Sequence, residues 1–516
     1  SYGNIGGKLI KSDGSQAGTG GGGAGAPGED VDTFQVPGDG GNGMQFDITG
    51  QNIFYAGGGG GGSIANQAFG GIGGGGNGAI SNGERGSNGT DGLGGGGGGA
   101  QGEEGGDGGD GIIIISYEIP KGTGHLTIVN NGGDQINSTW EYSNNTITTL
   151  TYSASIDSSV IENYVNSSTL TITANSISVE DDMEFTTSGN GITFKASSDI
   201  IIDSSDITTN GGNVHLWPDS NGNSSGRIGI YNGGITSNGG DITLSGGTDG
   251  NSYAVGTNTA FTSFANYRGV WFNNSTLNAN GTSDGGNITI KGKGYTSELT
   301  TDYNIGVDLT INSIIKTNHN GEILIDGVGG PHSTSGEHAA GINFFSQNQI
   351  ISADGTIELN GHAGGGSAST ARLDAGINFD GGLSGVTYDA KIYSNSGDIT
   401  LKGTKSSLSN SYGIMNGIDN IQTYIGTDGT NKTSGDIIII SDNFDLQDNY
   451  HTIETTGALV IKSSSNSFST NFNTSLNIDR PALLLLVAVV TFKNEVFIDS
   501  NANFNVSVFV VASTLG

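Results

Sequence analysis

A short alternation of apolar and polar residues recurs seven times between Gly211 and Ile439. Each copy begins with glycine, and its apolar positions are separated by one residue, which is the period of a half-buried strand. The copies read GGNVHL (211–216), GDITL (240–244), GNITI (286–290), GEILI (321–325), GTIEL (355–359), GDITL (397–401) and GDIII (435–439). The pattern predicts one strand per copy.

Two other apolar phrases accompany most copies. One reads GVWF (269–272), GVDL (306–309), GINF (341–344 and 376–379) and GIM (413–415), and the other reads IIKTN (314–318), QIISA (349–353) and KIYSN (391–395). Successive motif glycines are roughly 28 to 46 residues apart, a spacing typical of repeat arrays. Three strands per unit predict stacked coils with three faces.

Each unit is longer than its strands require. A coil of three short strands needs about 20 to 25 residues. The extra residues follow the first strand, at 327–340, 361–375 and 403–412, and they are polar, rich in glycine or serine, and irregular in length. Variable loops on one side of a rigid stack are where a solenoid usually binds ligands, although tolerated insertions would have the same pattern.

Residues 1–120 are a glycine-rich block with runs at 20–23, 57–62, 73–76 and 94–99. Dense glycine usually marks a flexible linker, but strand-like segments at 47–56 and 111–117 bracket these runs, which favours a folded module. The pattern over 45–118 resembles glycine-rich domains of bacterial surface proteins, phage tail adhesins and certain receptor ectodomains. This resemblance implies that the runs pack side by side as extended polyglycine helices, which glycine permits because it lacks a Cβ.

The rest of the chain divides into a transition at 121–181, the repeats at 182–463 and a tail at 464–516. The transition has alternating strands without the full repeat, so we expect it to cap the first coil. The tail is expected to close the other end or to contact the next subunit. Its apolar run at 482–490 is shorter than the roughly 20 residues of a membrane-spanning helix. We therefore predict a buried or subunit-contacting strand and no transmembrane segment.

The phrases NGGNVHLW (210–217), NGGDITL (238–244) and SGDITL (396–401) resemble the strand repeats of bacterial filamentous haemagglutinin-like exoproteins and adhesins. The resemblance extends over about residues 125–500. It implies an all-β chain, a right-handed parallel β-helix (β-solenoid) preceded by the glycine-rich module. It also implies a secreted protein of the cell surface that acts in adhesion, biofilm or filament formation.

The amino-acid composition argues against several classes of function. The 516 residues include 95 glycines and 33% hydrophobic residues, which suits a thin stacked core better than a large globular one. Lys plus Arg number 18 and Asp plus Glu number 50, so the net charge is 18 − 50 = −32. Such a surface repels phosphate backbones, which argues against a nucleic-acid partner. The absence of cysteine excludes disulfides, thiolate catalysis and cysteine zinc sites.

The candidate catalytic residues have structural interpretations. Asp241, Asp398 and Asp436 precede strands, where Asp and Asn bond to the backbone of their own turn. His332 lies in a glycine-rich loop, and we interpret it as a surface histidine because its surroundings do not match HExxH. We therefore predict no catalytic and no cofactor-binding residue.

Two segments carry oxygen ligands in patterns that calcium sites use. GGDGGDGI (105–112) matches a single copy of a calcium-binding nonapeptide repeat. DSNGN (219–223) has oxygen ligands at alternating positions but lacks the later Glu of an EF-hand. The calcium candidates are Asp107, Asp110, Asp219, Asn221 and Asn223.

These observations together predict a non-enzymatic extracellular protein with a structural or adhesive role. We expect a subunit of a fibre, filament or sheath that associates with itself through its termini and contacts surface glycans. The alternative is a polysaccharide-binding or polysaccharide-degrading β-helix protein of the tailspike or lyase type. Such proteins use the same scaffold and place carboxylates together on one exposed face.

Overall fold

The computed structural model describes most of the chain. The described residues are 3–10, 16–33, 35–115, 120–258, 267–297, 303–332, 339–365, 374–380, 388–408, 411–416, 421–446, 451–464, 473–474, 483–487 and 509–510. The chain divides into two compact units, Ser1–Glu118 and Ile119–Gly516.

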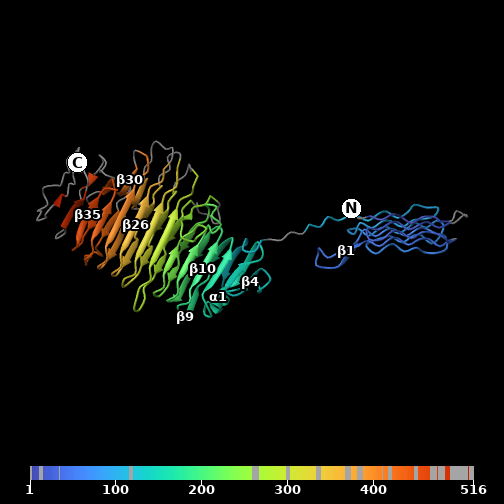
Figure 1. The fold of residues 1–516 in the computed structure, drawn as a ribbon, viewed down its shortest axis with the longest axis horizontal. Helices are drawn as coiled ribbons and strands as arrows, with labels where there is room; N and C mark the ends of the chain where they lie inside the picture. Colours follow the sequence, from blue (N-terminus) through green and yellow to red (C-terminus); the bar gives the residue numbers. More distant parts are fainter. Residues whose placement is uncertain are drawn as a thin grey trace, which may run out of the picture. The chain divides into compact units, whose positions relative to one another are not determined.

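The second unit is a solenoid-like stack of strands arranged in three long sheets (Figure 1). Within the described residues, the sheets contain 15, 12 and 9 strands, and nearly all neighbours in them run parallel. The 15-stranded sheet contains β4 (Trp140–Ser143), β5 (Thr146–Thr149), β7 (Leu170–Ala174), β10 (Ile192–Ala196), β13 (Val214–Trp217), β16 (Ile242–Leu244), β17 (Ala254–Val255), β20 (Ile288–Lys293), β23 (Ile323–Val328), β26 (Ile357–His362), β29 (Ile399–Thr404), β32 (Ile437–Ile440), β35 (Ala458–Lys462), β37 (Leu483–Val487) and β38 (Phe509–Val510).

Successive strands of the chain alternate among the sheets, so each full coil places one strand in each of them. The 12-stranded sheet contains β3 (His125–Val129), β6 (Ser153–Asp157), β8 (Ser176–Val179), β11 (Ile200–Asp203), β14 (Ile228–Tyr231), β18 (Val270–Asn273), β21 (Val307–Thr310), β24 (Ile342–Phe345), β27 (Ala375–Asp380), β30 (Tyr412–Asn416), β33 (Phe444–Leu446) and β36 (Asn473–Thr474). The 9-stranded sheet contains β9 (Met183–Ser188), β12 (Asp206–Asn210), β15 (Gly234–Thr236), β19 (Thr276–Asn278), β22 (Ile314–Lys316), β25 (Gln349–Ser352), β28 (Tyr388–Ser394), β31 (Ile421–Ile425) and β34 (His451–Ile453).

The predicted all-β fold with parallel strands is confirmed. All seven glycine-led phrases form strands of the 15-stranded sheet, the GVxF-like phrases form strands of the 12-stranded sheet, and the third phrases form strands of the 9-stranded sheet. In the apolar run at 482–490, the described residues form β37, which pairs in parallel with β35. The run is therefore a strand in its described part.

The core is a set of apolar columns that run from coil to coil. One column follows the strand register through Leu216, Leu244, Ile290, Ile325 and Leu359, all fully buried. The alternate positions of the same strands face outward. Period-two sequences therefore produce a dry interior, because every coil covers the apolar side chains of the one before it.

The corners of the coils use residues that tolerate sharp turns. Asn232, Asn274 and Asn312 each follow a strand of the 12-stranded sheet and have φ of 50°, 51° and 51°. Asparagine is enriched in this left-handed region. At another corner, buried hydroxyls bond to the glycine carbonyls that start the repeats, as Thr317 does to Gly286 at 2.7 Å. The corner residues thus satisfy backbone groups that the strands leave unpaired.

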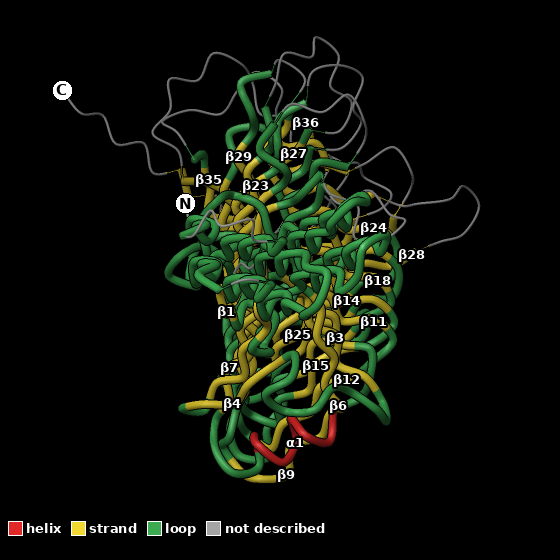
Figure 2. Tube along the Cα trace, turned by 90° about the vertical axis from the view of Figure 1, so that its right-hand side faces the viewer, coloured by secondary structure: helices red, strands yellow, loops and turns green. Residues whose placement is uncertain are grey.

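The first coils are covered by a short helix and a hairpin. The helix α1 (Ser158–Val165) packs against β9 and β6 and buries Ile161 and Val165 (Figure 2). Asp157 caps its first turn by accepting the Ser159 N–H at 3.0 Å. The hairpin of β4 and β5 is antiparallel, and its Tyr142 ring stacks on Tyr164 of the helix at 3.9 Å between ring centres. Both elements lie in the predicted transition, 121–181.

The first unit is built mainly from glycine backbone. Apart from the antiparallel hairpin of β1 (Met44–Phe46) and β2 (Ile53–Tyr55), it consists of extended glycine runs joined by backbone hydrogen bonds. The run at 57–62 bonds to the runs at 18–21, 38–41, 73–76 and 96–99, and it also accepts a hydrogen bond from Gly71. A strand in a sheet has only two neighbours, so these runs form a bundle rather than a sheet.

Glycine is a steric requirement of this bundle, and Gly58 illustrates why. A Cβ added at Gly58 would lie 2.0 Å from the carbonyl oxygen of Gly21. No side chain fits at that separation. The large side chains of the unit must therefore point away from the bundle.

Candidate functional site

The aspartates of the repeated phrase form hydrogen bonds between coils. Asp241 Oδ1 accepts the backbone N–H of Asn287 at 2.8 Å, and Asn287 Oδ1 accepts that of Glu322 at 2.9 Å. Asp398 Oδ1 likewise accepts the Asp436 N–H at 2.7 Å. The prediction that these aspartates bond to the backbone of their own turn is therefore wrong. Each carboxylate instead accepts the backbone N–H of the equivalent residue in the next coil, which parallel stacking brings within reach.

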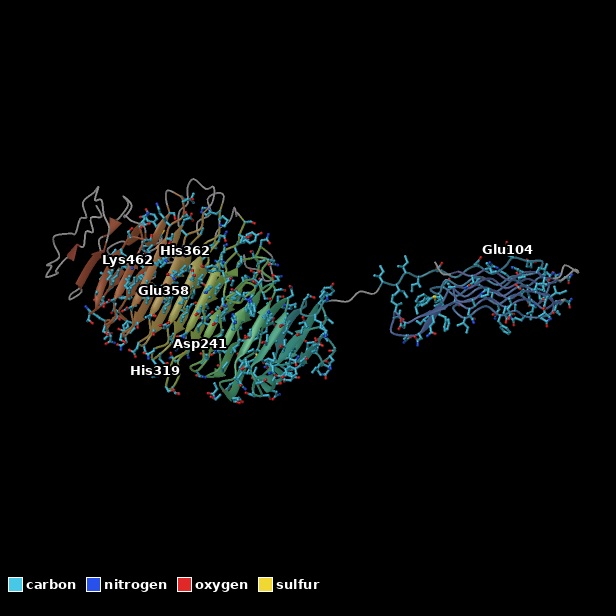
Figure 3. All side chains as sticks on the ribbon, viewed as in Figure 1. Glu104, Asp241, His319, Glu358, His362 and Lys462 are labelled. Carbon is cyan, nitrogen blue, oxygen red and sulfur yellow. The ribbon has the colours of Figure 1, made fainter. Side chains whose placement is uncertain are left out.

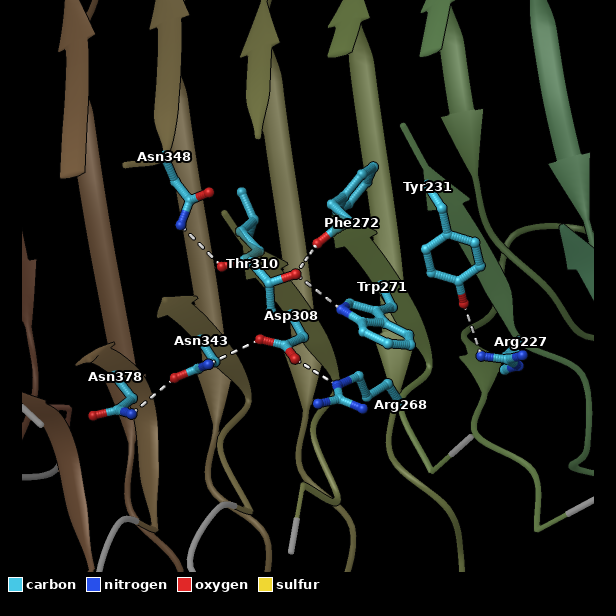
Figure 4. Close-up of polar contacts among 11 residues, drawn as sticks. Arg227, Tyr231, Arg268, Trp271, Phe272, Asp308, Thr310, Asn343, Asn348 and Asn378 are labelled. Atoms are coloured by element: carbon cyan, nitrogen blue, oxygen red, sulfur yellow. Dashed lines mark hydrogen bonds and ion pairs between the residues drawn. The ribbon is translucent and has the colours of Figure 1, made fainter. Parts of the chain in front are cut away.

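A row of buried polar side chains runs along the outer side of the 12-stranded sheet (Figure 4). Asp308, Asn343 and Asn378 occupy equivalent positions on β21, β24 and β27. Asn343 Nδ2 donates to Asp308 Oδ1, and Asn378 Nδ2 donates to Asn343 Oδ1, both at 2.8 Å. Arg268 Nε donates to the other Asp308 oxygen. Both oxygens of this carboxylate thus have partners inside the protein, as a buried charge requires.

Aromatic rings enclose the Arg268 end of this row. The guanidinium of Arg268 lies 4.3 Å from the Trp271 ring centre and 4.8 Å from that of Tyr303. Trp271 in turn meets Tyr231 edge to face at 5.0 Å. This stack stabilises the guanidinium through cation–π contacts, in addition to its ion pair.

A second buried ion pair lies two strands from the first. Arg227 is fully buried, its Nε lies 3.4 Å from Asp199 Oδ2, and its Nη1 donates to the Tyr231 hydroxyl at 3.0 Å. Burial raises the pKa of Asp199 above its usual value, while the neighbouring guanidinium of Arg227 opposes that rise. The pair joins residues of two successive coils.

His332 is buried, so its interpretation as a surface histidine is wrong. It is 1% exposed, and its Nε2 lies 2.8 and 2.9 Å from the two oxygens of the fully buried Asp374. The pair joins residues 42 positions apart. The sequence has no local pattern that predicts this contact, because the two residues are far apart in the chain and belong to successive coils.

The calcium candidates have partners within the protein. Asp107 forms an exposed ion pair with Arg85 at 2.8 Å, and the N–H of Asp110 donates to Asp91. Asp219 is 4% exposed, and its Oδ1 accepts the Ser225 N–H at 3.4 Å. Asn221 Oδ1 accepts the N–H of Asn223 at 3.2 Å. In the described part of the chain, no three His, Asp, Glu or Cys side chains are grouped closely enough to hold a metal ion, and calcium at these residues stays a prediction.

The outward side of the 15-stranded sheet concentrates positive charge. From β10 to β35 its outward positions carry the two carboxylates Asp326 and Glu358, against five lysines. The lysines are Lys195, Lys291, Lys293, Lys402 and Lys462. Figure 3 labels Glu358, His362 and Lys462 on this face. Among the described residues, Lys293, Lys402 and Lys462 take part in no ion pair, although the chain has 50 acidic residues.

A hollow in the glycine-rich unit offers little side-chain chemistry. Its volume is about 650 Å³, and its walls are glycine and alanine apart from Thr19. A ligand there would meet backbone amides and carbonyls almost exclusively.

Comparison with known proteins gives no relative for this chain. No protein-family model matches it, no curated protein is significantly similar to it, and no solved structure matches it significantly. Within the described residues, helices fall short of the length and apolar character needed to cross a membrane.

The buried polar row is the feature that sequence reasoning missed. Its signal was present, because Asp308, Asn343 and Asn378 stand at the same position of three successive GVxF-like phrases. A polar residue repeated between two apolar ones indicates a column of side chains in contact. Arg268 had no such signal, since it lies just before its phrase and reaches across to the next coil.

We predict that Asp241 contributes to stability through its acceptor oxygen. The Asp241→Ala variant should lower the free energy of unfolding by about 1 kcal/mol, because the Asn287 N–H loses its partner. Asp241→Asn keeps an oxygen at that position and should remain close to the parent protein. Urea unfolding of the three proteins measures this. Equal loss in both variants would show that charge, rather than the hydrogen bond, matters.

We predict that acid destabilises the last coils through His451. This side chain is 5% exposed, its two ring nitrogens have no hydrogen-bond partner among the described residues, and burial lowers its pKa from 6.5 to about 4. Folding therefore disfavours protonation of His451. The contribution of the neutral ring to the free energy of unfolding is present above pH 6.5 and is lost as the pH falls toward 4. The free energy of unfolding should drop by about 2 kcal/mol between pH 7 and pH 5 from this residue.

The control for His451 is the exposed His319. Urea unfolding at the two pH values should show a smaller loss for His451→Phe than for the parent, because phenylalanine does not titrate. His319→Asn, which keeps a residue suited to its positive φ, should lose as much as the parent. An unchanged pH dependence in His451→Phe would refute the assignment.

Proposed function

We propose that this protein is a non-enzymatic extracellular structural and adhesive protein. In this proposal it is a subunit of a surface fibre, filament or sheath that associates with itself through its termini and contacts surface glycans. The observation that carries the proposal is the internal use of the repeated polar groups. Asp241, Asp308 and Asp398 accept hydrogen bonds from neighbouring coils. These bonds hold successive coils together, which is a structural role, and they occupy the carboxylate oxygens.

Two finer features belong to the same proposal. We infer that the coils turn in the right-handed sense, which strand–crossover–strand connections in a sheet almost always take. We also infer a polyglycine-helix arrangement for the first unit, supported by the run at 57–62, which bonds to more than two neighbouring stretches. A chain without disulfides would gain durability from this continuous backbone bonding.

The polymer part of the proposal is tested by imaging the purified chain. At high protein concentration with calcium, electron micrographs should show filaments or ordered aggregates, because calcium reduces repulsion between strongly acidic copies. Size-exclusion chromatography at low concentration gives the monomer reference. Strictly monomeric particles under both conditions would remove the polymer role and leave adhesion alone.

The second candidate function is polysaccharide binding, and the lysine-bearing face of the 15-stranded sheet favours it. Lys402 and Lys462 lie two strands apart on that face, about 10 Å along the stack. The outward hydroxyls of Thr289, Thr400 and Thr404 lie on the same face. A linear acidic polysaccharide, such as one rich in uronate, would match lysines and hydroxyls spaced along a rigid surface.

The lysine face makes a measurable prediction. Lys402→Ala with Lys462→Ala should weaken retention of a uronate-rich polysaccharide in affinity electrophoresis by about tenfold, because two charge contacts are lost. Lys316→Ala, which removes a half-exposed lysine of the 9-stranded sheet, is the matched control and should not change retention. No retention of the parent protein on any acidic polysaccharide, or equal effects in both variants, would end this candidate.

A further inference from the structure

Most of the exposed large apolar side chains of the described chain belong to the glycine-rich unit. Of sixteen such residues, twelve precede residue 118, although this unit holds less than a quarter of the sequence. The cause is the glycine bundle itself, which has no room for side chains and turns them outward. Such exposure in a folded unit marks an interaction surface.

One end of the unit gathers these side chains. The hairpin β1–β2, the turn at 72–74, the turn at 91–94 and the outgoing chain after 110 are tied together there. The Gly43 N–H donates to Ile72 O at 2.7 Å, that of Ala56 to Leu93 O at 2.8 Å, and that of Gly94 to Asp110 O at 3.0 Å. The exposed members of this apolar end are Phe46, Ile48, Ile72, Ile112, Ile113 and Ile115.

The segment 111–115 is the most exposed part of the apolar end. Ile113 is 89% exposed and Ile115 is 80% exposed. The segment is extended, and no backbone hydrogen bond joins it to another described residue. Isoleucine strongly favours strands. An exposed apolar segment with unpaired backbone groups is a template for pairing with another strand.

We propose that the apolar end binds a second copy of this chain, with the two 111–115 segments paired as antiparallel strands. This deepens the proposed self-association and rests on it. An antiparallel pair of identical segments has twofold symmetry, so one patch serves both copies. Ile113 is the middle residue and faces its own equivalent, while Gly111 faces Ile115.

The acidic residues that precede the segment favour antiparallel over parallel pairing. Asp107 and Asp110 precede the segment, and they would meet their own equivalents in a parallel pair. Antiparallel pairing moves the two Asp110 residues beyond opposite ends of the five-residue strand, roughly 20 Å apart and beyond the screening length of about 8 Å at physiological salt. The same carboxylates oppose an anionic membrane as the occupant.

The area of the apolar end suits a dimer. From their exposed fractions, its six side chains present on the order of 700 Å², which is close to the roughly 800 Å² that each partner contributes to a standard protein interface. The mostly β-branched isoleucines pack well against each other across paired strands.

Single cysteines test the pairing, because the chain contains none. In an antiparallel pair, equivalent residues at the centre have Cα atoms about 4.5 to 5.5 Å apart, within the range of a disulfide. The full-length Ile113→Cys protein should form a covalent dimer on mild oxidation. Ile115→Cys should not link to itself, but it should link to Gly111→Cys when the two proteins are mixed. Equal linking through Ile80→Cys, an exposed site away from the apolar end, would overturn the proposal.

Sedimentation velocity of the full chain gives the affinity. Ile113→Asp with Ile115→Asp should raise the dimer dissociation constant about 100-fold or more, because two buried isoleucines are replaced by charge. Ile80→Asp should leave it unchanged. A monomeric parent protein, or dimers that persist in the double variant, would refute the interface.

The outcomes separate this inference from the proposed function. If the double variant still forms filaments, this interface is wrong while the fibre role stands. If the Ile113→Cys protein forms covalent dimers but the parent forms neither filaments nor complexes with glycans, the interface stands and the proposed function fails.

Discussion

Parallel pairing in register is the constraint on which the second unit depends. It places equivalent side chains of successive coils about 4.8 Å apart, so whatever occupies one position contacts its own equivalent. Apolar residues gain from this repetition, as the column through Leu216, Leu244 and Ile290 does. Identical charges at that spacing would repel. In the buried row of the 12-stranded sheet, Asn343 and Asn378 both donate and accept, so they can occupy neighbouring equivalent positions.

The same need to pair backbone groups has the opposite consequence in the first unit. There the bonded runs approach so closely that Gly58 has no space for a Cβ. Backbone occupies the interior, and apolar side chains such as Ile72 and Ile113 are left outside. One chain thus combines a unit that buries its apolar residues with a unit that displays them. An exposed apolar surface of this kind is typical of an interaction site.

The sequence predicted strands and faces well because both follow local rules. Period-two alternation and recurring glycines depend on neighbouring residues, and they placed each phrase in its sheet. The partners of Asp241 and His332 depend on register and loop packing across 42 to 46 residues, which a single sequence does not encode in any local pattern. The column of Asp308, Asn343 and Asn378 was predictable in part. The repeat shows that these residues are aligned, but only the folded structure shows that they are buried.

The first coils of the stack are closed to pairing with a further coil. At the first coils, α1 buries Ile161 and Val165, and the antiparallel hairpin β4–β5 closes the 15-stranded sheet. A helix and a hairpin interrupt parallel pairing, so a further coil from another molecule finds no template there. Continuous stacking through this end is therefore disfavoured. In the glycine-rich unit, by contrast, no helix or hairpin covers the segment 111–115, and no backbone hydrogen bond joins it to another described residue.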